Sequence, residues 1–106
     1  ERLMDAVGCV SGSSPAFVYM FIEALADSGV KYGLPRKTAY AMAAQTVMGS
    51  ARMVLETGKH PGQLKDEVCS PGGTTIAGVS ALEEHGLRSA VIKAADACYE
   101  KTQRMK

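Results

Sequence analysis

The stretch of the sequence best suited to chemistry combines two glycines and three hydroxyl side chains directly before a predicted helix: Ser70-Pro71-Gly72-Gly73-Thr74-Thr75. Unpaired backbone N–H groups converge at a helix N-terminus, and the helix dipole adds partial positive charge there. Glycine lets a ligand approach the backbone closely, because it has no Cβ. We therefore predict a site for a compact anion such as a carboxylate, favoured by about 1–2 kcal/mol through the dipole. The alternative is that this loop only turns the chain and caps a helix.

Other chemical functions fit the sequence less well. The loop has no lysine at the spacing of a phosphate-binding P-loop, and no strand precedes it as in a dinucleotide-binding turn. Lys65 and Asp66 could line the site, although a solvated helix face is the favoured explanation for them. His60, at a predicted helix start, is expected to be structural. Glu23 is expected to be a carboxylate that is paired or satisfied at an interface. Cys69 lies beside the loop, and its redox sensitivity stays open.

The elements that must position this loop are all predicted to be helical. A short helix is expected over residues 1–10, and Ser14-Pro15 has the pattern of a hydroxyl cap followed by a first-turn proline. Glycine and proline then separate the later periodic segments. We expect helices over residues 15–31, 35–56, 61–68, 74–84 and 87–103, with no strand. The predicted fold class is all-α, a bundle of about five to six helices forming one domain over residues 1–106.

The helix predicted to begin at Pro15 is apolar on nearly every side, because Glu23 is the one charged residue between Pro15 and Ala26. Such a helix is either deeply buried or embedded in a membrane. The stretch is shorter than the roughly 20 residues that a membrane span needs. We therefore predict that another subunit covers it and that the protein does not enter a membrane. The helix over residues 35–56 carries a stripe of small residues and methionine suited to close packing: Ala39, Met42, Ala43, Thr46, Val47, Ser50 and Met53.

Composition excludes several classes of function. A formal net charge of +1, from 12 basic and 11 acidic residues, gives no general attraction to nucleic acid. The three cysteines, Cys9, Cys69 and Cys98, show no paired spacing, which indicates reduced thiols and a cytoplasmic location. They form no metal-ligand pattern with His60 and His85. The chain shows no signal-peptide pattern. Because it begins with Glu1 and not with Met, we interpret it as a fragment or a processed form of a longer protein.

Three blocks of this sequence resemble the pyrroline-5-carboxylate reductases. The main block is the run from His60 to Gly78, HPGQLKDEVCSPGGTTIAG, followed by Leu82-Glu83. The others are residues 11–16, SGSSPA, and residues 24–31, ALADSGVK, which lead to GLPR at 33–36. They occur in order along essentially the whole chain. Ser14 and Phe17 stand where the family commonly has glycine and tyrosine, and Cys69 stands where small hydroxyl residues are frequent.

The resemblance implies a fold and a reaction. These enzymes reduce 1-pyrroline-5-carboxylate to L-proline with NADPH or NADH, bound mainly by an N-terminal Rossmann domain that this chain lacks. Their C-terminal half is an intertwined helical dimerisation domain, of a type shared with 6-phosphogluconate dehydrogenase. It forms homodimers, which often assemble into rings. By this resemblance, the imino-acid carboxylate would be held around the loop, by Ser70, Gly72, Gly73, Thr74 and Thr75. Thr75 would also lie near the ring nitrogen as a proton donor or relay, so it is the predicted catalytic residue.

Two other interpretations stay open at this stage. The chain could be a helical dimerisation module with no catalytic duty, or the same fold could serve a related reductase that is linked to a Rossmann domain. The loop favours the enzyme, because a scaffold has no need for glycines and hydroxyls at a helix start. Alone, the chain is expected to be inactive, since it lacks a nicotinamide site. No metal site is expected in it either.

Overall fold

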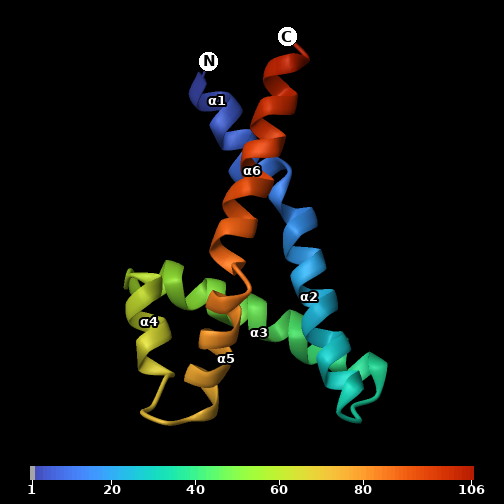
Figure 1. Cartoon of the computed structure of the whole chain (residues 1–106), viewed down its shortest axis with the longest axis vertical. Coiled ribbons are helices and arrows are strands. Elements are labelled where there is room, and N and C mark those ends of the chain that lie inside the picture. Colours follow the sequence, from blue (N-terminus) through green and yellow to red (C-terminus); the bar gives the residue numbers. More distant parts are fainter. Residues whose placement is uncertain (1) are drawn as a thin grey trace. The chain divides into compact units, whose positions relative to one another are not determined.

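The computed structural model describes residues 2–106, and it shows helices and connecting turns with no strand in that range (Figure 1). The prediction of an all-α fold is confirmed. The elements in chain order are α1 (Arg2–Val7), η1, a π-helix (Gly8–Gly12), α2 (Ser14–Lys31), α3 (Arg36–Thr57), α4 (Pro61–Glu67), α5 (Thr74–Glu84) and α6 (Leu87–Arg104). The five helices predicted after residue 14 begin and end within one residue of these bounds.

Glycine and proline fix most helix boundaries through local geometry. Helix α3 ends at Gly58, which adopts a left-handed conformation with φ 70° and donates its N–H to the Val54 carbonyl at 3.2 Å. Helix α4 begins with Pro61, whose fixed φ suits the first helical position. Helix α6 begins after Gly86, which is also left-handed, with φ 75°. Left-handed conformations cost glycine little energy, so these helix boundaries could be predicted from the glycines in the sequence.

The N-terminal helix differs from the prediction in how it ends. It continues past Val7 as the π-helix η1, in which Ser13 N donates to Gly8 O at 3.0 Å. The Ser14 hydroxyl does not cap α2 by accepting an N–H; instead it donates to the Cys9 carbonyl, so its predicted role was wrong. The physical reason is that α2 already includes Ser14, so its hydroxyl does not stand at the flanking position from which a cap accepts an N–H and instead reaches back over the π turn. Residue 1, included in the predicted first helix, lies outside the described residues.

The structure divides into two compact units, one of which spans Phe21–Ala81. Its core consists of the buried side chains Ala26, Ala39 and Ala43, where α2 meets α3. Ile22, Val30 and Tyr40 pack around this alanine core, half-buried. An exposed ion pair between Arg36 and Asp27, 2.9 Å long, links the same two helices. Alanine methyls allow a close helix approach, as the small-residue stripe predicted, but they bury little apolar area.

The other unit combines the chain up to Met20 with Leu82–Lys106. Here α1, η1 and α6 contact one another, and Cys9 is buried among them. Burial raises the pKa of the Cys9 thiol, so it stays neutral as the predicted apolar filler. Asp5 accepts hydrogen bonds from Gln103 Nε2 at 2.7 Å and from Lys106 Nζ at 2.5 Å. These bonds lower the pKa of Asp5.

Large apolar side chains remain exposed on both units. On α2, for example, Tyr19 is 67% exposed and Met20 is 66% exposed. The helical run Leu3–Lys31 counts 29 residues and is long and apolar enough to cross a membrane by length and composition. The length argument against a membrane span therefore fails, because α1 and η1 extend the apolar stretch before α2. Length and apolar composition alone are weak evidence for a membrane span, because the core helix of a protein outside membranes can have both.

Candidate functional site

The predicted anion loop lies between α4 and α5 and contains a tight turn. Gly73 N donates to Ser70 O at 3.1 Å, which closes a four-residue turn. Pro71 occupies its second position and Gly72, with φ 71°, its third. A positive φ at the third position is the requirement of a type II turn, so Gly72 is needed for its backbone conformation. Helix α5 begins at Thr74, immediately after this turn.

The structure brings the predicted ligands together at this helix start. Ser70 precedes the turn, and Thr74 and Thr75 are the first two residues of α5. All three are exposed, and within residues 2–106 none of their hydroxyls hydrogen-bonds to another protein group. The first turn of α5 also carries no acidic residue that would repel an anion. These hydroxyls and the first amides of an 11-residue helix are therefore available to donate to an anion at this helix start.

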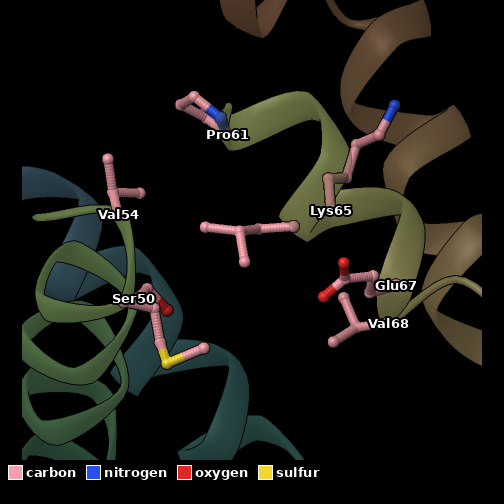
Figure 2. A pocket seen from close by; sticks show the side chains of 8 residues that line it. Ser50, Val54, Pro61, Lys65, Glu67 and Val68 are labelled. Carbon is pink, nitrogen blue, oxygen red and sulfur yellow. The ribbon is translucent and has the colours of Figure 1, made fainter. Parts of the chain in front are cut away.

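The charged residues before the loop belong to α4 and do not enter the turn. Lys65 Nζ lies 3.4 Å from Asp66 Oδ1, and Lys59 Nζ lies 3.1 Å from Glu67 Oε2. The half-exposed Lys65 also lines a groove described below (Figure 2). The solvated-face interpretation of Lys65 and Asp66 thus describes their positions better than a role in the loop.

His60 has a structural role, as predicted. Its Nδ1 accepts a hydrogen bond of 2.9 Å from Gly62 N, so the imidazole caps α4 in place of a serine or aspartate side chain. The cap fixes the start of the helix that leads into the loop.

The remaining candidates lie elsewhere. Cys69, beside the turn, is half-buried, and all three cysteines are free thiols. Glu23 is exposed on α2 and forms no ion pair within the described part of the chain, so the predicted partner is not supplied there. No group of three or more His, Cys, Asp or Glu side chains that could hold a metal occurs among residues 2–106.

Sequence reasoning missed a groove between α3 and α4. Figure 2 shows Ser50 and Val54 of α3 on one side of this groove and Pro61, Glu67 and Val68 on the other, whereas the end of the Lys65 side chain points away from it. The volume is about 370 Å³, and most of the lining is apolar: Met53 and Val54 from α3, and Pro61, Leu64 and Val68 from the segment that contains α4. The spacing of these apolar residues either side of Gly58 was a usable signal. The stripe predicted on residues 35–56 includes Ser50 and Met53 but not the other lining residues, so it indicated close packing and not a groove.

Comparison with known proteins decides the family. The sequence model of the family described as pyrroline-5-carboxylate reductase dimerisation matches residues 1–105. The chain belongs to this family. The resemblance seen in the sequence, and the dimerisation domain it implied, are confirmed.

Named relatives support the same assignment for this pyrroline-5-carboxylate reductase dimerisation domain. Pyrroline-5-carboxylate reductase of Escherichia coli (strain K12) is 62% identical over 105 residues, which cover 99% of this chain and 39% of the relative. A crystal structure of Plasmodium falciparum pyrroline carboxylate reductase with NADP bound matches at 42% identity and a TM-score of 0.95, over 99% of this chain and 40% of that one. The structure of a pyrroline-5-carboxylate reductase from Coxiella burnetii matches at 38% identity and a TM-score of 0.96, over 100% and 39%. The domain thus spans about two-fifths of the relatives it matches.

Proposed function

We propose that this chain is the dimerisation and substrate-binding part of an enzyme that reduces 1-pyrroline-5-carboxylate to L-proline with NADPH or NADH. The observation that carries the proposal is the loop, with three unpaired hydroxyls at the start of α5, in a chain that matches the reductase dimerisation family over residues 1–105. The substrate is a small ring bearing one carboxylate and one imine. Its carboxylate is the kind of compact anion that such a helix start binds.

The residues of this chain do not fit the nicotinamide cofactor. A dinucleotide site needs a strand that leads into a glycine-rich turn, and residues 2–106 contain no strand. The proposal therefore assigns the cofactor, which supplies the hydride, to residues other than these. The chain alone is expected to show no reductase activity.

In this proposal the chain's own residues anchor and orient the substrate. The Ser70 and Thr74 hydroxyls, with the amides that open α5, donate to the carboxylate and fix the position of the imine carbon. The Thr75 hydroxyl lies one residue further into α5 and donates a proton toward the ring nitrogen. Few ionisable groups are needed, because the imine is itself basic and becomes electrophilic when protonated.

A second copy of the chain completes the proposed assembly. Helix α2 exposes four large apolar side chains: Val18, Tyr19, Met20 and Phe21. Neither compact unit of the chain covers them. A dimerisation family and an exposed apolar helix support a homodimer in which α2 is buried between subunits. Rings of such dimers and a cytoplasmic location remain predictions.

The test is substitution of Thr75 in a longer protein that carries this chain behind a nicotinamide-binding domain. Oxidation of NAD(P)H driven by pyrroline-5-carboxylate should fall about 100- to 10,000-fold in Thr75→Ala, as expected for losing general acid assistance, and recover in Thr75→Ser. Thr46→Ala is the control, because the Thr46 hydroxyl donates to Met42 O within its own helix.

Two results would contradict the proposal. Unchanged turnover in folded Thr75→Ala would remove the proton-donor role. A parent protein that is folded and dimeric but shows no pyrroline-5-carboxylate reduction would favour a dimerisation module without catalytic duty, or a related reductase with another substrate.

A further inference from the structure

The two glycines of the loop are needed for different physical reasons. Gly72 has φ 71°, a conformation that other residues adopt only with strain. Gly73 is not among the glycines with positive φ, so its backbone conformation is open to any L-residue. The space around Gly73 is what restricts it. A Cβ built on Gly73 would lie 2.6 Å from Ser70 Oγ and 3.2 Å from Ser70 O.

The contact at 2.6 Å is shorter than a carbon and a hydroxyl oxygen can tolerate, so one of them must move. The Ser70 backbone cannot move far, because its carbonyl accepts the Gly73 N–H at 3.1 Å in the turn. The Ser70 hydroxyl is free to rotate about χ1, since it has no hydrogen-bond partner within the described residues. A side chain at position 73 would therefore displace the hydroxyl from its place beside the start of α5.

We propose that Gly73 is a positioning residue: by lacking a Cβ, it leaves the space in which the Ser70 hydroxyl stays aimed at the bound carboxylate. This inference rests on the proposed function of the loop. The sequence alone indicated that Gly73 leaves room for the ligand. The structure adds that Gly73 leaves room for the Ser70 side chain. The carboxylate contact belongs to Ser70, and Gly73 acts through it.

The kinetic test is a double-mutant cycle in the whole enzyme, with the variants Gly73→Ala, Ser70→Ala and both together. Losing one hydrogen bond to a charged group should raise the KM for the imino acid about 10- to 100-fold in either single variant, with a smaller effect on kcat. The double variant should be no worse than Ser70→Ala alone. Gly78→Ala is the control on the same helix, because a Cβ there meets nothing within 4 Å.

Other outcomes would overturn the inference. If Gly73→Ala raises KM by the same factor whether or not Ser70 keeps its hydroxyl, glycine is needed for the ligand and not for Ser70. If Gly73→Ala leaves KM unchanged, no positioning exists.

A second readout separates this inference from the proposed function. The thermal stability of the same four proteins, measured without substrate, reports the collision directly: Gly73→Ala should lower Tm when Ser70 is present and lower it less when it is combined with Ser70→Ala. If the Tm values show this coupling but Ser70→Ala has no effect on KM, the carboxylate site is refuted and the collision between positions 70 and 73 stands. An additive stability cycle would refute the collision itself.

Discussion

Replacing Met20 by glutamate should dissociate the proposed dimer. The Met20 side chain is 66% exposed on α2. Burying a whole methionine side chain contributes about 1.5–3 kcal/mol, so covering two-thirds of it contributes about 1–2 kcal/mol per subunit. A twofold interface contains the residue twice, which gives about 2–4 kcal/mol for the dimer. Burying an unpaired carboxylate costs further, so the dimer should weaken at least about 1,000-fold.

The assay is sedimentation equilibrium of the chain over a range of concentrations, with Met20→Glu beside Gln63→Glu. Gln63 is exposed on α4, and its isosteric change adds the same charge outside the apolar helix. The control should keep the parent's dissociation constant, and Met20→Leu should stay close to it. A dimer of unchanged affinity in Met20→Glu would refute the assignment of α2 to the interface. A parent chain that is monomeric and folded at micromolar concentration would refute the dimer altogether.

Two further predictions concern stability. Gly58→Ala should lower the free energy of unfolding by about 1–2 kcal/mol, because Gly58 is left-handed. Gly49→Ala should raise it by about 0.5–1 kcal/mol, because Gly49 lies in the middle of α3 and a Cβ there meets nothing within 4 Å. Denaturant titration measures both changes, and a loss of stability in Gly49→Ala would show that a partner packs against this position. The hydrogen bonds from Lys106 and Gln103 lower the pKa of Asp5, so their stabilisation should be complete above its ordinary pKa of 3.8 and be lost as the pH falls through the lower folded value. We expect Tm, measured between about pH 2 and about pH 6, to fall less steeply with decreasing pH in Asp5→Asn than in the parent. Equal slopes of Tm against pH would exclude Asp5 as the cause.

The sequence predicted the helices well because their boundaries depend on local chemistry. Gly58, Pro61 and Gly86 act on their own backbone, and their effects need no knowledge of distant residues. The same holds for the loop, where Pro71 and Gly72 specify the turn and Thr74 opens the helix. Geometry set by neighbours in sequence could thus be predicted from the sequence.

Features that depend on contacts between elements could not be predicted in this way. The π-helix η1 follows from hydrogen bonds shifted by one residue, which no periodicity signals. Of the apolar stripe on α3, Ala39 and Ala43 are buried whereas Met42 is 54% exposed, because periodicity identifies a face but not what covers it. The collision that restricts Gly73 needs the position of the Ser70 hydroxyl, which depends on the folded turn.

The π-helix has a consequence for insertions and deletions. A π turn holds one residue more than the α turn it replaces, and each residue of an α-helix rotates the chain by roughly 100° about the axis. Removing one residue from Gly8–Gly12 would therefore convert the π turn into an α turn and leave α1 at nearly its present angle about the axis. Asp5 would keep its place beside Gln103 and Lys106, to which it bonds. The same deletion within α1 itself would turn the residues before it by about 100° and separate Asp5 from these partners, so the π turn is the position in this segment that best tolerates a change of length.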